Sequence, residues 1–265
     1  MKKLLAMMLA LTFVLALAAC NGGVGTGTND TTDAGDVTTK PTEETTVPGG
    51  NENEPVDPNK KSEGVMTYAQ YDAAAKDDAV VIEGFVQATQ SWWDNKITVY
   101  LQDGDGAYFL YELACSEADA AKLVPGTKIK VEGFKTEWAG EIEVASGATF
   151  TFVDTEDTWI ATAMDATALL GTDDLIKHQN KLVKFTDMTV VSIEYKNGQP
   201  GDDIYVKLSK NGAEYDFCVE YYLTGDDTAV YAAVGALQAG DVIDVEGFLY
   251  WYNAVNTHII AVTKK

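Results

Sequence analysis

The chain has 265 residues and an acidic composition, with 41 Asp and Glu against 19 Lys and Arg and a formal net charge of −22 at pH 7. All of its basic residues are lysine, so it lacks the guanidinium fork that suits phosphate and carboxylate recognition. Neither half carries a basic stripe that would neutralise nucleic-acid phosphates. The composition therefore argues against a nucleic-acid partner, and the length predicts one or two domains.

The first 19 residues are typical of a targeting segment that is removed from the mature chain. Their apolar run, 4–16, is marginal as a membrane span, because crossing a bilayer takes about 20 apolar residues. The sequence LAAC at 17–20 resembles the lipobox of bacterial lipoproteins and implies cleavage before Cys20 and a lipid on its thiol. We therefore expect an extracytoplasmic protein anchored through Cys20 to the outer face of a bacterial cell membrane, with the lipid bilayer as a partner. An ordinary secretory signal with an incidental cysteine is the alternative.

Residues 20–63 are predicted to form a disordered tether between the lipidated cysteine and the folded region. Residues 21–62 contain nine Thr, seven Gly and four of the six prolines, with no aromatic residue. Such a segment buries too little apolar surface to offset the entropy lost on ordering it. The folded region is therefore expected to begin at residue 64.

The first half of the folded region, residues 64–157, predicts three strands, a helix and two further strands. A short helix is expected ahead of them, over 66–75. Ser116 is a candidate N-cap for the helix between the third and fourth strands, which ends before Pro125. Apolar alternation between turn residues places the strands at 79–89, 97–102, 107–113, 127–134 and 141–146.

The second half, residues 158–265, repeats this order. LVPGTKIKVEGF at 123–134 returns as LQAGDVIDVEGF at 237–248, with seven of the twelve residues identical. Matching positions of the repeat, Phe134 and Phe248 among them, are expected to be equally buried. The strands are predicted at 181–195, 203–210, 213–223, 241–248 and 256–262, with an Asn211-Gly212 hairpin turn and a helix over 226–237.

The order strand, strand, strand, helix, strand, strand is that of the OB fold, a five-stranded, partly open barrel. The predicted fold class is all-β with short helices: two tandem five-stranded OB-type barrels after a disordered linker. The stretches SWWDNK at 91–96 and QDGDGAYFLY at 102–111 resemble a group of tandem OB-fold surface lipoproteins of Gram-positive bacteria. The resemblance covers residues 64–265; it implies the fold and a surface location, and it brings no activity with it.

No combination of residues in the sequence indicates a reaction. The two histidines, His178 and His258, lie in unlike contexts without a Ser-His-Asp or Cys-His pattern. The acids at 103–112 depart from the calcium-loop pattern and are read as a polar hairpin turn. Cys115 and Cys218 lack zinc-ligand spacing, which leaves buried small side chains or a disulfide between the repeats. We therefore predict a non-enzyme without catalytic residues, metal or cofactor.

Aromatic residues between strands are the candidate ligand-binding residues. Trp92 and Trp93 fall between the first and second strands and Trp138 between the fourth and fifth, in loops that flank the usual ligand face of the fold. We predict that Trp93 and Trp138 frame a shallow cleft with Tyr100 as its floor. The hydrogen-bonding candidates beside them are Asp94, Asn95 and Glu137, and the second barrel offers Tyr250 and Trp251.

The sequence favours a non-catalytic, membrane-anchored module that binds a glycan or another neutral ligand. A sugar ring can pack its C–H face on an aromatic ring without a cationic partner. A structural or protein-interaction module of the cell envelope is the alternative, in which the rings close the barrel ends or join the barrels. Single-stranded nucleic-acid binding comes third, because stacking rings would suit it. The expected partners are therefore a glycan or an envelope protein.

Overall fold

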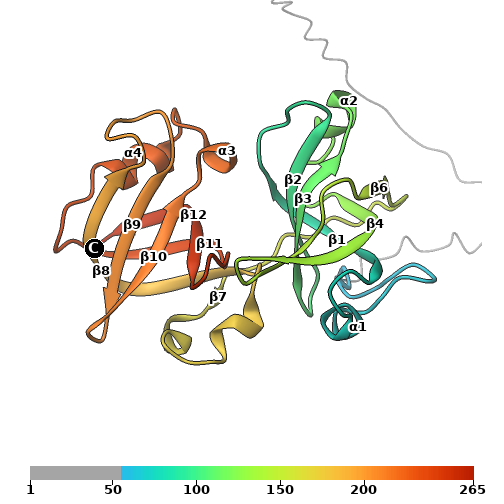
Figure 1. The fold of residues 1–265 in the computed structure, drawn as a ribbon, viewed down its shortest axis with the longest axis horizontal. Helices are drawn as coiled ribbons and strands as arrows, with labels where there is room; N and C mark the ends of the chain where they lie inside the picture. Colours follow the sequence, from blue (N-terminus) through green and yellow to red (C-terminus); the bar gives the residue numbers. More distant parts are fainter. Residues whose placement is uncertain (1–54) are drawn as a thin grey trace, which may run out of the picture. The chain divides into compact units, whose positions relative to one another are not determined.

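Two β-barrels follow one another along the chain, in a computed structural model that describes residues 55–265 (Figure 1). Barrel 1, teal to green, contains α1 Tyr68–Ala73, β1 Ala79–Thr89, β2 Lys96–Gln102, β3 Ala107–Ala114, α2 Glu117–Ala120, β4 Lys128–Trp138, β5 Glu141–Val144 and β6 Thr149–Phe152. Barrel 2, yellow to red, contains β7 Met164–Asp165, η1 Thr167–Leu169, η2 Leu175–His178, β8 Leu182–Tyr195, β9 Ile204–Lys210, β10 Ala213–Val219, α3 Tyr221–Thr224, α4 Ala229–Gly235, β11 Val242–Phe248 and β12 Asn256–Lys264.

Both barrels have the same strand topology. Barrel 1 has the order β1-β2-β3-β5-β4 and is closed by pairing of β1 with β4. Barrel 2 has the order β8-β9-β10-β12-β11 and is closed by pairing of β11 with β8. In each, the third and fifth strands run parallel. This closure, with a helix before the fourth strand, is the tandem OB topology, so the predicted fold class is confirmed.

Local sequence signals set the ends of several elements. The Ser116 hydroxyl accepts a hydrogen bond from the Asp119 amide at 3.1 Å and caps α2, which ends at Ala120, earlier than predicted. Asn211 and Gly212 have positive φ angles of 53° and 82°, as a tight two-residue hairpin turn requires. The short strands β6 and β7, which the sequence analysis did not predict, add to β4 and β8 outside the closed rings.

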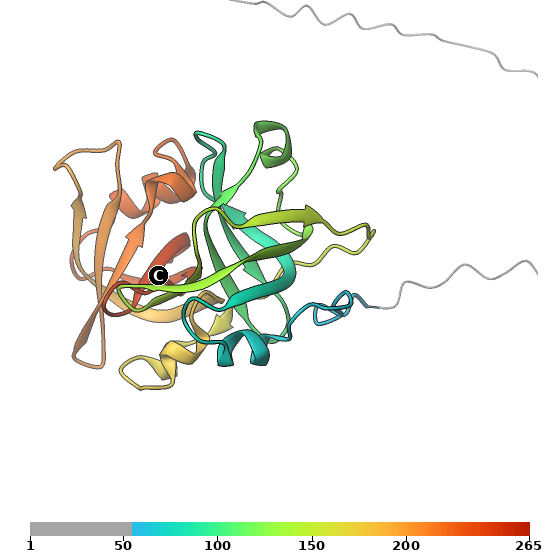
Figure 2. The same cartoon turned by 45° about the vertical axis from the view of Figure 1, so that its right-hand side comes forward.

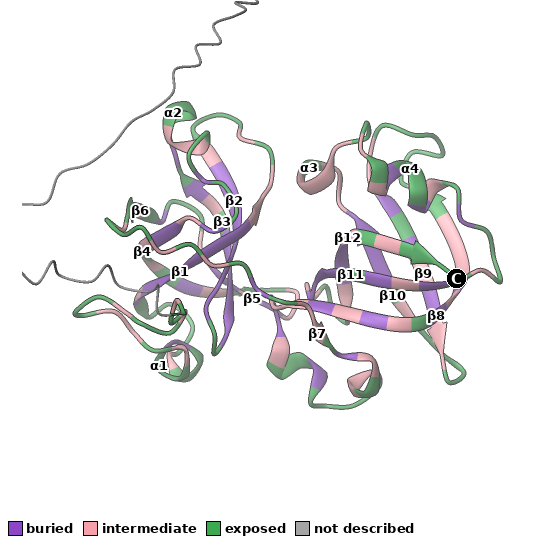
Figure 3. Ribbon diagram, turned by 180° about the vertical axis from the view of Figure 1, so that it is seen from behind, coloured by how far each residue is buried: buried purple, intermediate pink, exposed green. Residues whose placement is uncertain are grey.

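Each barrel encloses an apolar core of its own, visible as buried segments along the strands (Figure 3). Strand alternation directs every second side chain inward. Ile129 and Val131 of β4 are fully buried in barrel 1, and Ile243 and Val245 of β11 are fully buried in barrel 2. At these positions the repeat has the same structural role in both halves.

The prediction that Phe134 and Phe248 are equally buried is wrong. Phe134 is 58% exposed, whereas Phe248 is 1% exposed. Each of the two residues lies an odd number of positions after the inward-facing residues of its strand, so both rings point to the outer side of their own barrel. Phe248 is nevertheless buried because barrel 1 covers it, and its ring stacks on Tyr100 with the centroids 4.4 Å apart.

A third apolar cluster joins the barrels. Its buried members are Tyr100, Phe109 and Phe248. Polar contacts surround it: the Leu182 amide of barrel 2 donates to the Gln102 side-chain oxygen of barrel 1 at 3.0 Å. The two barrels lie in one compact unit, so a site formed between them has a defined geometry.

The segment just before barrel 1, expected to belong to the tether, contacts the barrel from Pro58 onward. It runs beside α1 (Figure 2). The Lys61 ammonium pairs with the Asp103 carboxylate at 2.5 Å, and the Lys128 ammonium donates to the Lys60 carbonyl at 2.6 Å. These contacts tie residues 60 and 61 to β4 and to the turn between β2 and β3.

The predictions on the cysteines have different outcomes. Cys20, the targeting segment and LAAC lie outside the described residues. Cys115 and Cys218 are free and buried, which matches small buried side chains and not a disulfide between the repeats. Within residues 55–265 no helix is long and apolar enough to cross a bilayer.

A candidate ligand-binding cleft between the barrels

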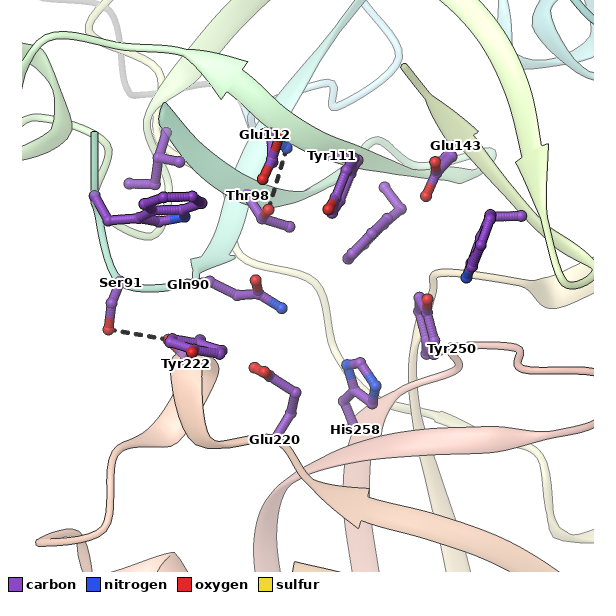
Figure 4. Close-up of a pocket in the computed structure, with 14 residues that line it drawn as sticks. Gln90, Ser91, Thr98, Tyr111, Glu112, Glu143, Glu220, Tyr222, Tyr250 and His258 are labelled. Carbon is purple, nitrogen blue, oxygen red and sulfur yellow. Dashed lines mark hydrogen bonds between the residues drawn. The ribbon is translucent and has the colours of Figure 1, made fainter. Parts of the chain in front are cut away.

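A cleft of about 850 Å³ lies between the two barrels (Figure 4). Side chains from both barrels line it, with Tyr111, Glu112 and Glu143 entering from barrel 1 and facing residues of barrel 2. Its rings are those of Trp93, Phe109, Tyr111, Trp138, Tyr222 and Tyr250. Its carboxylates are those of Glu112, Glu143 and Glu220. The cleft is therefore both aromatic and acidic.

A tight hairpin turn places Trp93 at the cleft. The Trp93 amide donates to the Lys96 carbonyl at 3.1 Å and the Lys96 amide donates back at 2.9 Å. Asp94 and Asn95 fill the turn with positive φ angles of 46° and 59°, which these residue types tolerate. The Trp93 side chain is 53% exposed. The Lys96 ammonium lies 4.2 Å from its ring centroid and pairs with the Glu112 carboxylate at 3.1 Å.

Trp138 ends β4 at a turn that barrel 2 holds in place. Ala139 and Gly140 follow it with positive φ angles of 51° and 90°. The Asn253 amide donates to the Ala139 carbonyl at 2.6 Å, and the Gln179 side-chain amide donates to the Gly140 carbonyl at 2.7 Å. The Trp138 ring stays 62% exposed, so it is accessible to a ligand in the cleft.

Barrel 2 contributes a fixed aromatic wall. The Tyr250 ring stacks on His258 with the centroids 4.2 Å apart and contacts Phe109 of barrel 1 edge-on at 5.2 Å. The His258 Nδ1 atom and the Tyr100 hydroxyl are 2.6 Å apart, within hydrogen-bond distance. Burial lowers the pKa of His258 to about 3, so its ring is neutral at pH 7. Contacts with Tyr100 and Phe109 of barrel 1 thus hold this wall in place without a ligand.

The three carboxylates of the cleft have different partners. Glu112 pairs with Lys96. Glu220 caps α3 by accepting a hydrogen bond from the Leu223 amide at 2.7 Å, and burial raises the pKa of its carboxyl to about 7. Glu143 is 7% exposed, and burial raises its pKa to about 7 as well, with no pairing or hydrogen bond to offset it. Glu143 therefore faces the cleft as an uncompensated carboxyl group.

The structure brings three of the predicted residues together at the cleft: Trp93, Trp138 and Tyr250. Tyr100 points out of barrel 1 as predicted, but it is 1% exposed because Phe248 of barrel 2 covers it. Tyr100 is therefore part of the joint between the barrels and does not form the floor of the cleft.

The other predicted residues lie outside the cleft lining. Trp92 packs against the core of barrel 1, and its indole N–H donates to a backbone carbonyl at 2.8 Å. Asp94 and Asn95 form the exposed tip of the turn, and Glu137 is exposed on β4. Trp251 is half-buried beside the turn after β4. None of the five belongs to the cleft lining.

The cleft residues Glu143, Glu220, Tyr222 and His258 were not among the residues predicted from the sequence to bind a ligand. A signal for the first of them was present, because alternation in EIEV places Glu141 and Glu143 on the face opposite the buried Val144. No signal in the sequence indicated that barrel 2 covers this face. Glu220, Tyr222 and His258, which lie at α3 and on β12, reach the cleft only through that packing.

The acidic residue Asp103 stabilises the turn between β2 and β3 by accepting hydrogen bonds within it. The Asp103 carboxylate accepts hydrogen bonds from the amides of Asp105 and Gly106 at 2.9 and 2.7 Å and from the Tyr108 hydroxyl at 2.8 Å. In the part of the chain that the structure describes, no group of three or more His, Cys, Asp or Glu side chains is placed to hold a metal ion.

Comparisons with known proteins give low similarity throughout. No family model matches the chain, and no curated protein matches it. Among solved structures, a murine DNA-binding protein bound with double-stranded DNA is 12% identical with a TM-score of 0.35, covering 71% of this chain and 96% of its own. The p204 HINb domain is 10% identical with a TM-score of 0.33, covering 72% and 98%. The p202 HIN1 domain in complex with a 12-mer double-stranded DNA is 9% identical with a TM-score of 0.32, covering 80% and 100%.

These complexes correct the expectation that argued against nucleic acid as a partner. That expectation rested on net charge and on the absence of arginine, whereas two of the solved structures named above contain double-stranded DNA. It is not retained. At these TM-scores the likeness assigns no ligand to this chain.

Proposed function

We propose that residues 55–265 form a non-catalytic binding module whose site is the cleft between the barrels. The observation that carries this proposal is the set of aromatic rings that both barrels direct into one cleft of about 850 Å³, a volume typical of small-molecule sites. Trp93 and Trp138 keep more than half of their surface exposed there. Large exposed rings at a concave site are characteristic of ligand contact.

A glycan or another ring-shaped neutral ligand suits this cleft. The C–H face of a sugar packs on an aromatic ring, and its hydroxyls require donors and acceptors nearby. Gln90, Ser91 and Thr98 line the cleft beside the rings and offer amide and hydroxyl groups. The fixed Tyr250 wall lowers the entropic cost of binding, because its position is set in advance.

Nucleic acid is the second candidate, because exposed Trp93 and Trp138 could also stack bases. Its phosphates would have to lie away from the three cleft carboxylates. The two candidates differ in salt dependence: nucleic-acid affinity falls steeply with salt, whereas the affinity of a neutral ligand changes little.

Replacing Trp138 with alanine should weaken ligand binding about 5- to 150-fold, because a stacked ring is worth about 1–3 kcal/mol. The full chain is titrated with neutral oligosaccharides, single-stranded DNA and double-stranded DNA at low and high salt, followed by tryptophan fluorescence. Phe134→Ala is the matched control, since that exposed ring of barrel 1 lies outside the cleft lining. Equal loss in both variants, or no response to any ligand, would leave a structural or protein-interaction module as the better account.

We also propose that the module is anchored to a bacterial membrane through lipid on Cys20. The proposal is supported by LAAC closing a short, lysine-led apolar segment. Cys20→Ala should move the protein from the membrane fraction to the soluble fraction or leave it unprocessed. Metabolic labelling with a fatty acid, followed by fractionation, measures this; unchanged labelling and processing would rule the anchor out.

A further inference from the structure

Glu143 is a buried carboxylate without a counter-charge. Its side chain is 7% exposed, and within the described residues burial is the one resolved influence on its pKa, with no ion pair or hydrogen bond acting on it. Burying an unpaired carboxylate is costly, so such groups are uncommon unless they serve a site. Glu143 therefore calls for an explanation beyond the fold.

Its position on β5 directs it into the cleft. Val144 points into the core of barrel 1, so alternation turns Glu143 to the opposite side, where barrel 2 lies. Glu141 shares that side, but its carboxylate accepts the Trp251 amide at 2.8 Å and is sealed from solvent. Figure 4 shows Glu143 at the cleft, on the same side as Tyr111 and across from Tyr250. Only Glu143 of this pair is open to a ligand.

The cleft already contains one arrangement in which a carboxylate and a ring hold an ammonium group. The Lys96 ammonium lies 4.2 Å from the Trp93 centroid and 3.1 Å from the Glu112 carboxylate. A cation over an aromatic face is attracted by the ring quadrupole, and a neighbouring carboxylate adds a charge-assisted hydrogen bond. Glu143 shares the cleft lining with the rings of Tyr111, Trp138 and Tyr250, but no lysine of the described chain pairs with it.

We propose that the cleft takes a small organic ligand carrying an ammonium group, which Glu143 pairs with while the surrounding rings enclose it. This inference rests on the proposed binding function of the cleft, but it replaces the neutral ligand proposed above with a positively charged one. An amino sugar and a small alkylammonium compound share this chemistry. The carboxylate supplies the charge, and the rings of Trp138 and Tyr250 supply the apolar and cation–π contacts.

Matched ligands test the proposal on the full chain. Oligomers of glucosamine and of N-acetylglucosamine have the same sugar rings, but only the first carries ammonium groups; choline carries the charge without a sugar. Binding is measured by calorimetry at pH 7, because the amines of glucosamine lose their protons above this pH; Glu143, with a pKa of about 7, is about half ionised there in the free protein. We expect the glucosamine oligomer to bind at least about tenfold tighter than its N-acetylated counterpart. Choline binding would identify the ammonium group alone as sufficient.

The variant Glu143→Gln removes the charge and keeps the shape of the side chain. It should abolish the preference for the charged ligand, and it should raise the melting temperature of the free protein at pH 8, because a buried unpaired charge is lost. Glu132→Gln is the control, since it removes an exposed carboxylate of barrel 1 outside the cleft. Equal binding of both oligomers, unchanged by Glu143→Gln, would overturn the ammonium proposal and leave the binding function standing. No binding of either oligomer, of choline or of nucleic acid would overturn both.

Discussion

Truncating Phe248 to alanine should lower the free energy of unfolding by about 3–5 kcal/mol, whereas the same change at Phe134 should cost less than about 0.5 kcal/mol. The two residues occupy matching positions of the internal repeat. Phe248 is 1% exposed and stacks on Tyr100 across the joint between the barrels, while Phe134 is 58% exposed. The cost at Phe248 is the lost burial of a ring plus the cavity that it leaves.

Urea denaturation of the two variants measures this difference. Because Phe248 lies in the joint and outside the core of barrel 2, its loss should also weaken the coupling of the barrels, so that fluorescence and circular dichroism no longer report one common transition. Similar unfolding midpoints for the two variants would contradict this account of the joint. A loss at Phe134 as large as at Phe248 would mean that another surface covers Phe134 in solution.

The strands were predictable because successive side chains of a strand alternate between the inside and the outside of the barrel, so that apolar residues recur at every second position. Strand β1 has the predicted bounds, and Ile129, Val131 and their repeat partners are buried as expected. Short-range signals also worked: Ser116 caps α2, and Asn211 lies in a hairpin turn. Such features depend only on residues that are close together in the sequence, so they can be recognised in a single sequence.

The joint between the barrels was not predictable, because it depends on which outer faces meet. Tyr100 and Lys207 are equivalent outward positions of the two barrels, yet Tyr100 is covered by barrel 2 while Lys207 pairs with the exposed Asp216 at 2.7 Å. Nothing in the alternation pattern distinguishes a face that will be covered from one that will stay open. The same limit explains why Trp93, Trp138 and Tyr250 were found as cleft residues, whereas Glu220, Tyr222 and His258 of barrel 2 were not.

Acid should destabilise the protein through His258, by about 1.4 kcal/mol for each pH unit below 6.5. Burial lowers the pKa of this histidine to about 3 in the folded state, against about 6.5 in an unfolded chain. Between these values the unfolded state binds a proton that the folded state does not, so the stabilising contribution is complete above about pH 6.5 and is lost as the pH falls toward 3.

Glu143 and Glu220 act in the opposite direction. Their pKa values are raised to about 7 by burial, against about 4.3 when unfolded. The folded state therefore keeps protons that the unfolded state releases, and stability contributed by these groups is present at low pH and is lost as the pH rises toward 7. In the wild type the two effects overlap between about pH 4.5 and 6.5, so the overall pH curve alone cannot separate them.

The variant His258→Asn isolates the histidine, because it removes the titrating group and keeps a polar side chain near the Tyr100 hydroxyl, 2.6 Å from the histidine Nδ1 atom in the wild type. Every other titrating group is common to both proteins, so their contributions cancel in the difference of the two unfolding free energies. We expect the advantage of the wild type over His258→Asn to shrink by about 1.4 kcal/mol per unit from pH 6 to pH 4. Denaturant titrations at half-unit pH steps measure it. Parallel curves over this range would mean that His258 accepts a proton within the folded protein, and that the aromatic wall of the cleft is open to water.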